Sequence, residues 1–323
     1  MTAEARQEVL RLLESHRGRK RELLKKLRIS ESTYYLWRDR YLTKGPEGLQ
    51  AKVPNRQGGW NRMTAKEEEV VVARAREFPE KTSRLLAIWI TDHDDFSVSE
   101  STVFRVLKAK GMIAARPRDE NPAAKEYRWK TTRPNEMWQT DGSTFVVPRW
   151  GYYKWIPVLD DFSRRVMADD LKPEETGANV ADVMQEALDA IGSEELPIER
   201  RPVLLSDNGP AFTCELLAEY LSGRGIRQIH GAPYHPQTQG KVERLNRRIK
   251  ETVNLLVYET PMALRAALRA EVDRYNDTPH EGILNVTPNE MYEGRQEEIL
   301  ARRAAKKRWT IEMRKAANMT LAA

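Results

Sequence analysis

The sequence of 323 residues has a single cysteine, Cys214, and only five histidines. One cysteine excludes a disulfide framework and is typical of a protein that folds in a reducing compartment. No group of cysteines and histidines has the spacing of zinc ligands, so no zinc-binding module is expected.

Long apolar runs and targeting patterns are also missing. No run approaches the roughly 20 apolar residues that a membrane-spanning helix needs, and no signal-peptide pattern is present. A Gly-rich phosphate loop ending in Lys-Ser or Lys-Thr is absent, so no nucleotide cofactor is expected. We therefore expect a cytoplasmic protein that contacts no membrane and uses no ATP.

Charge is unevenly distributed, although the net charge of +6 is modest. Residues 1–60 hold fourteen Lys and Arg against seven Asp and Glu, and residues 297–323 hold seven against three. The middle of the chain is therefore net acidic. Basic ends around an acidic middle suit a polyanionic partner held at both ends, although solvated helical faces would give the same pattern.

The first third of the chain has helical patterns and one repeated motif. The segment Ile29–Tyr35 is matched by Val98–Phe104, and Ser30 is predicted to cap the helix that follows it. We interpret the two copies as helix-turn-helix units, at 1–60 and 61–115. Helices are expected at residues 3–15, 19–27, 31–41, 65–76 and 83–91.

In a helix-turn-helix unit, the first turns of the third helix face the major groove of DNA. The side chains expected there are Ser32, Tyr35 and Arg38 in the first unit, and Ser101 and Arg105 in the second. A packing helix in a protein-interaction bundle would show the same pattern, so this alternative stays open.

An α/β pattern occupies residues 135–260, after a polar linker at 116–134. Three strands joined by short turns come first, and helices then alternate with strands, which predicts a mixed sheet. The strands are expected at 138–147, 152–159, 165–171, 203–205 and 226–229. The helices are expected at 177–191, at 211–222 and from 241 onward. A helical region at 261–323 ends the chain, with helices at 261–276 and, rich in basic residues, at 297–317.

Three carboxylates follow or begin these elements. Asp141 comes after Trp138–Thr140, Asp207 ends the strand Val203–Leu205, and Glu243 lies in the first turn of a helix. Acidic residues on separate elements converge only where cations offset their repulsion, and carboxylates are preferred ligands of Mg²⁺ and Mn²⁺. Two such ions, about 3.5–4 Å apart, clamp the attacking and leaving oxygens of a phosphoryl displacement.

Four blocks in this order carry a family resemblance. They are Val158–Arg165, Ser206–Pro210, Pro233–Asn246, and Tyr275-Asn276 with Thr287–Tyr292. Over nearly its whole length the chain resembles the DDE transposases and integrases, most closely the bacterial insertion-sequence-three type. The resemblance implies a ribonuclease-H-like core with Asp141, Asp207 and Glu243 as the catalytic and metal-binding triad. Two ions, Mg²⁺ or Mn²⁺, are implied as cofactors.

The resemblance also bears on residues around the triad. It places Asp160 and Asp161 outside the triad, as the cap of a turn. Gly142 and Ser143 stand where family members commonly have an aromatic residue and threonine, and Gly142 is expected to loosen its strand. The residues implied or expected to contact DNA near the triad are Tyr234, Gln237, Gln239, Asn246, Arg247 and Lys250; the last three share a helical face with Glu243.

The leading hypothesis is a DNA transposase that binds the ends of a mobile element and cleaves and joins strands. Double-stranded DNA, a homo-oligomer and a bacterial, nucleoid-associated location are the implied partners and setting. A catalytically idle DNA-binding regulator is the alternative from another class. A nuclease that cleaves hybrids without joining is a third, and helix-turn-helix units argue against it. The basic helix near Trp309 would grip DNA or a second subunit, or be a frayed tail.

Overall fold

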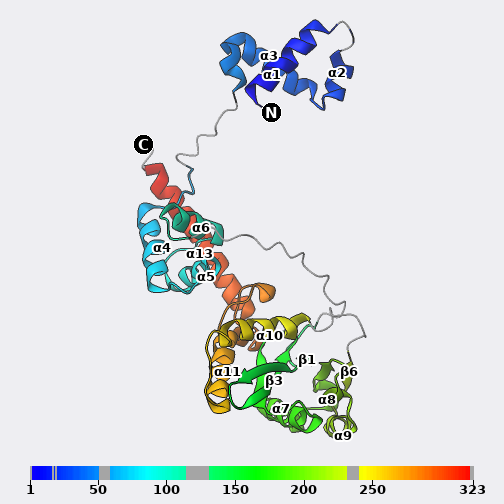
Figure 1. The fold of residues 1–323 in the computed structure, drawn as a ribbon. Helices are drawn as coiled ribbons and strands as arrows, with labels where there is room; N and C mark the ends of the chain where they lie inside the picture. Colours follow the sequence, from blue (N-terminus) through cyan, green and yellow to red (C-terminus); the bar gives the residue numbers. More distant parts are fainter. Residues whose placement is uncertain are drawn as a thin grey trace. The chain divides into compact units, whose positions relative to one another are not determined.

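The computed structural model describes residues 2–16, 18, 20–50, 59–113, 131–230 and 240–320 (Figure 1). Two compact units form: Met1–Arg62 with Ala316–Ala323, and Met63–Lys315. Most of the expected linker at 116–134, and residues 231–239, lie outside the described residues. Within the described part of the chain, no helix is long and apolar enough to span a membrane.

The first unit contains the three predicted helices, α1 (Ala3–Ser15), α2 (Lys20–Lys26) and α3 (Glu31–Lys44), followed by a short 3₁₀ turn, η1 (Gly45–Leu49). Ser30 caps α3 as predicted, because its hydroxyl accepts from the amide of Thr33 at 3.2 Å. The core of the unit consists of Leu10, Leu13, Leu24, Tyr34, Trp37 and Leu49. Burial of Tyr34 and Trp37 leaves the opposite face of α3 exposed.

The second helix-turn-helix unit consists of α4 (Ala65–Glu77), α5 (Ser83–His93) and α6 (Glu100–Ala109). It belongs to the same compact unit as the α/β region. Its core is formed by Val71, Leu86, Ile90, Val103 and Leu107, among others. Ser99 caps α6 through the amide of Thr102, and Gly111, with a φ of +71°, follows its end.

The sheet is mixed, as predicted. Its strands are β1 (Met137–Thr140), β2 (Ser143–Val147), β3 (Gly151–Asp160), β4 (Val166–Lys172), β5 (Val203–Ser206) and β6 (Gln228–His230). β1 and β2 both pair with β3, antiparallel and in the same register. They therefore lie end to end along the same edge of β3. β4 flanks β3 on its other side, while β5 and β6 add parallel to β1. This arrangement is the ribonuclease-H-like core that the sequence predicts.

Helices cover the two faces of this sheet (Figure 1). One face carries α7 (Gly177–Ala190), α8 (Pro210–Thr213) and α9 (Glu215–Gly223), packed on Trp138, Ile156 and Leu204 among others. The other face carries α10 (Gly240–Val253) and α11 (Pro261–Asn276), packed on Phe145, Trp155 and Leu159 among others. On α10 the residues Val242, Leu245, Ile249 and Val253 form an apolar stripe, and all four are buried.

The prediction of one helix over 211–222 is wrong, because α8 and α9 are separate. Cys214, between them, has an extended backbone with φ −75° and ψ 148°. Its sulfur lies where a side chain at Gly177 would otherwise begin. The break therefore packs Cys214 closely against the first residue of α7, which only a glycine there permits.

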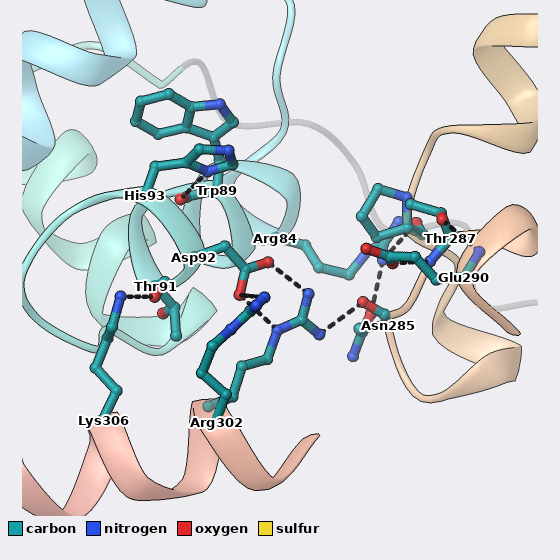
Figure 2. A network of polar contacts seen from close by, with 12 residues as sticks. Arg84, Trp89, Thr91, Asp92, His93, Asn285, Thr287, Glu290, Arg302 and Lys306 are labelled. Carbon is teal, nitrogen blue, oxygen red and sulfur yellow. Dashed lines mark hydrogen bonds and ion pairs between the residues drawn. The ribbon is translucent and has the colours of Figure 1, made fainter. Parts of the chain in front are cut away.

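The last helix, α13 (Gln296–Thr320), follows the short helix α12 (Pro288–Tyr292) and docks on the second helix-turn-helix unit. The Arg303 guanidinium donates to both oxygens of Asp92, at 2.8 and 2.6 Å. Lys306 donates to the carbonyls of Thr91 and Asp94, and Figure 2 shows the lysine at Thr91. This docking is none of the roles that the sequence suggested for the basic helix.

Further contacts extend the docking to both sides. Arg314, nearer the end of α13, pairs with Glu67 of α4 at 3.0 Å. On the other side, Arg84 of α5 donates to the side chain of Asn285 at 2.8 Å (Figure 2). The second helix-turn-helix unit is thus held by residues that lie about 200 positions later in the chain.

Arg303→Ala should lower the free energy of unfolding by about 3 kcal/mol, because it leaves Asp92 charged and mostly buried. The two side chains are only 15% and 16% exposed. Arg302 is the matched control: it is 55% exposed and stands 4.0 Å from the same carboxylate. Arg302→Ala should cost less than about 1 kcal/mol. Equal losses in urea denaturation of the two variants would contradict this assignment.

Candidate active site

The pairing of two parallel strands brings the first two candidate carboxylates together. In the register of β1 and β5, Gln139 lies opposite Leu205. Asp141 and Asp207 each come two residues later, on the same face as that pair. Because neighbouring strands lie about 4.8 Å apart, the two carboxylates emerge side by side at the carboxyl edge of the sheet.

The helix α10 supplies the third carboxylate. Its buried stripe packs on the sheet, while Glu243, in the first turn, is exposed. The amide of Asn246 ties the helix directly to Asp141, because it donates to the carboxylate Oδ2 at 3.0 Å and to the carbonyl at 3.2 Å. The helix that carries Glu243 therefore lies against Asp141.

The electrostatics of Asp141 reflect these neighbours. Its pKa is raised to about 6, first by burial and then by the charges of Asp207, Glu175 and Glu243. The hydrogen bond from Asn246 acts in the opposite direction. Three acidic groups from separate parts of the chain thus concentrate negative charge around Asp141.

Asp207 is shaped by the turn that follows β5. Its Oδ1 accepts the amide of Gly209 at 2.8 Å, which closes the Asp-Asn-Gly turn. The Nδ1 atom of His230 lies 3.2 Å from the Asp207 carbonyl, so the end of β6 contacts this turn as well. One Asp207 carboxylate oxygen is used by the turn, which orients the other.

Glu175 is a fourth acidic residue of the site that sequence reasoning missed. It precedes α7 in no recognisable motif, and only the structure brings its carboxylate to Gly142. That carboxylate occupies the space in which a side chain at position 142 would begin, and it pairs with Lys154 at 3.4 Å. Gly142 was expected to loosen its strand; the structure shows instead that it leaves room for Glu175 beside Asp141.

Asp160 and Asp161, the two carboxylates at the end of β3 that were placed outside the triad, differ in role. Asp160 closes a turn as predicted, accepting from the amides of Asn135 and Ser163 and from the Ser163 hydroxyl. Asp161 is also buried, but it bonds to side chains of β1 and α10. Beyond the predicted turn, Asp161 therefore connects β1 to α10.

The predicted DNA-contacting residues fall into three groups. On the first turns of α3 and α6 the exposed ones are Ser32, Tyr35, Arg38, Ser101 and Arg105. On α10, Arg247 is exposed and Lys250 is half-buried with its ammonium 5.8 Å from the Phe145 ring centroid, whereas Asn246 is buried against Asp141. Tyr234, Gln237 and Gln239 lie outside the described residues. Of the three residues expected to share a DNA-contacting face of α10, Asn246 is thus buried, and only Arg247 and Lys250 are accessible.

A divalent cation is chemically suited to this site. In the described ranges, no three Asp, Glu, His or Cys side chains stand close enough to form a ready-made metal cluster. The donor set fits nevertheless, because the raised pKa of Asp141 comes partly from carboxylates whose repulsion a cation would offset. Asp141, Asp207 and Glu243 are the residues that would hold it.

Comparison with protein families finds matches of two kinds. Residues 131–236 and 224–288 match families described as integrase core domain. Residues 1–50 and 33–107 match families described as homeodomain-like domain. The candidate triad lies within the integrase core matches, and the exposed residues of α3 and α6 lie within the homeodomain-like matches.

Individual relatives are viral polyproteins and integrases. The chain is 32% identical over 170 residues to the Gag-Pol polyprotein of gibbon ape leukemia virus, covering 50% of this chain and 10% of the polyprotein. It is 34% identical over 175 residues to that of baboon endogenous virus, covering 54% and 9%. The chain thus spans about a tenth of the length of these curated relatives.

Solved structures of integrases are similar over half of the chain. The HTLV-2 integrase catalytic core domain in complex with magnesium has a TM-score of 0.40 and 23% identity, covering 50% of this chain and 99% of that one. The catalytic core domain of BIV integrase has a TM-score of 0.38 and 26% identity, covering 51% and 97%.

Glu175→Gln should lower the pKa of Asp141 below its value of about 6, because one of the negative charges that oppose its ionisation is removed. Carboxyl NMR titration of metal-free protein measures this pKa. Glu174→Gln is the matched control, since Glu174 is exposed and adjacent in sequence but is not among the groups that raise this pKa. A pKa of Asp141 that responds equally to both substitutions would remove Glu175 from the site.

Proposed function

Because this chain carries an integrase core domain behind homeodomain-like domains, and so belongs to the DDE transposase and integrase superfamily, we propose that it is a DNA transposase. In this proposal it binds the ends of a mobile element through its helix-turn-helix units. Its core cleaves the strands at those ends and joins them to target DNA.

One observation carries the proposal: Asp141 and Asp207 emerge together from neighbouring parallel strands, and α10 presents Glu243 from the helix that is bonded to Asp141. A scaffold that only supported DNA binding would have no reason to crowd carboxylates around a residue whose pKa is raised by them. Crowded carboxylates suit phosphoryl transfer, because they can hold the divalent cations that bind the negatively charged phosphate.

Two divalent ions, Mg²⁺ or Mn²⁺, would supply electrophilic stabilisation of the phosphate and activation of the attacking oxygen when bound. The protein's own contribution is to hold Asp141, Asp207 and Glu243 in place. Asn246 orients the Asp141 carboxylate, and the Gly209 amide orients that of Asp207. No side chain is required as a covalent nucleophile.

The two proposed steps balance without an external energy source. In the first, a water oxygen attacks the phosphorus at the element end, the bond to the 3′ oxygen breaks, and a 3′-hydroxyl is released. In the second, that 3′-hydroxyl attacks a target phosphodiester, one P–O bond forms and one breaks, and the target's own 3′-hydroxyl leaves. Since one phosphodiester replaces another, no ATP is needed.

Recognition of the element ends is assigned to the exposed faces of α3 and α6. Ser32, Tyr35 and Arg38 line the first face, and Ser101 and Arg105 the second. The first unit contains the strongest concentration of basic residues, so it would supply most of the affinity for DNA. Two ends must be brought together for joining, so the proposal includes a homo-oligomer on double-stranded DNA.

Asp207→Asn and Glu243→Gln should each reduce strand cleavage by more than about 100-fold while leaving the Kd for end DNA within a few-fold. Each substitution keeps the size of the side chain and removes the charge that a cation needs, whereas the helix-turn-helix units that bind DNA are untouched. Gel shift and cleavage with Mg²⁺ on one labelled end substrate measure both quantities.

Wild-type cleavage by either variant would show that the triad is misassigned. Selective end binding by the wild-type chain without any cleavage, in Mg²⁺ or Mn²⁺, would instead support the regulator hypothesis. Circular dichroism of each variant is the control for folding.

Arg247→Ala should reduce the salt dependence of DNA binding, because each lost phosphate contact removes roughly 0.9 from the log–log slope. Arg247 is exposed on α10 and has no hydrogen-bond or ion-pair partner among the described residues. Arg200→Ala is the control, since Arg200 is also exposed but precedes the amino end of β5, the end remote from Asp207. An unchanged slope for Arg247→Ala would mean that α10 presents no phosphate-binding face.

A further inference from the structure

A buried polar cluster joins the ends of β1 and β3 to the first turn of α10. Asp161, which is 1% exposed, accepts the Gln139 amide at 2.7 Å and the Lys241 ammonium at 2.6 Å. The same ammonium donates to the Asp161 carbonyl at 3.0 Å, and the hydroxyl of Thr131 donates to the carboxylate at 2.6 Å. The other end of the Gln139 amide group accepts the backbone amide of Val242 at 3.3 Å.

The position of Lys241 in the helix makes these contacts informative. A cation in the first turn of a helix is opposed by the helix dipole, which favours negative charge there. The first amides of a helix also lack partners within the helix. The buried Asp161 carboxylate offsets the unfavourable interaction of Lys241 with the helix dipole. Gln139 accepts a hydrogen bond from one of the first amides, that of Val242.

The same cluster includes a residue two positions before each of two catalytic candidates. Gln139 is two residues before Asp141 on β1, and Lys241 is two residues before Glu243 on α10. Asp161 bonds to both and so connects the strand of one carboxylate to the helix turn of another.

We propose that Asp161, Gln139 and Lys241 form a latch that fixes the first turn of α10 and thereby sets the position of Glu243 over Asp141. These are positioning residues, since Asp161 bonds to Gln139 and Lys241 and does not itself belong to the triad. The latch explains why two adjacent carboxylates are needed at the end of β3. Asp160 closes its own turn, whereas Asp161 holds the catalytic helix.

The competing role for Lys241 is direct contact with a DNA phosphate. Its side chain is 26% exposed, so its charge is not fully enclosed by the protein. The two roles make different predictions. A phosphate contact acts on DNA affinity independently of Asp161, whereas a latch acts on the chemical step and depends on Asp161.

The test compares Asp161→Asn, Lys241→Met and the double variant in the full-length protein. We expect each single variant to lower kcat for end cleavage by about 10- to 100-fold, with KM, Kd and the salt slope unchanged. The double variant should be no slower than the slower single variant, because both remove one interaction. Lys241→Arg should restore cleavage to within a few-fold, since it keeps the ion pair.

Hydrogen exchange gives a readout that needs no catalysis and applies even if the proposed function fails. The amides of Val242 to Leu245 should exchange at least several-fold faster in Lys241→Met than in the wild type. Arg244→Met is the matched control: it too removes a first-turn cation, but one that is exposed and has no partner among the described residues, and exchange should not speed up. If Asp161→Asn fails to fold, the lysine variants still decide the question.

Three results would overturn the latch. The first is multiplicative loss of activity in the double variant together with a salt slope reduced by about 0.9, which would make Lys241 a phosphate contact. The second is unchanged exchange of the first turn of α10 in Lys241→Met. The third is wild-type kcat in both single variants. Absence of cleavage by the wild type would contradict the proposed function, and the exchange result would still report on the latch.

Discussion

The parallel pairing of β1 with β5 is the constraint on which the rest of the site depends. With Gln139 opposite Leu205, the two strands bring Asp141 and Asp207 to one edge and to one face. Slipping the register by one residue would turn one of these carboxylates to the other face. It would also displace Trp138, which is fully buried beneath α7. The relative position of the two carboxylates is therefore as stable as the core.

The helix α10 is attached to that sheet by two kinds of contact with different consequences. Its apolar stripe supplies most of the buried surface, but apolar contacts are non-directional and tolerate small displacements. The buried amides of Gln139 and Asn246 are directional and must find partners, so they select one position of the helix. Glu243 projects from the turn between these two anchors.

The second helix-turn-helix unit is integrated with the C-terminal helix. Contacts of α13 fall on α4, on α5 and on the segment after it, through Glu67, Asp92 and Ser97. The first turns of α6 are left exposed, including Ser101 and Arg105. The docking thus stabilises the unit through α4, α5 and the segment after α5, while the proposed DNA-contacting face on α6 remains accessible.

The sequence by itself determined the helices, the strands and the elements that carry Asp141, Asp207 and Glu243, because apolar periodicity, caps and turn residues act over a few neighbouring positions. It also identified the superfamily. Only the tertiary structure placed Glu175 against Gly142, divided the predicted helix at Cys214, buried Asn246 and docked α13 on the second helix-turn-helix unit. Asp161 likewise looked like a second turn cap until its partners on β1 and α10 were known. Each of these features depends on contacts between residues that are distant in the chain, and no local pattern records which distant residues will meet.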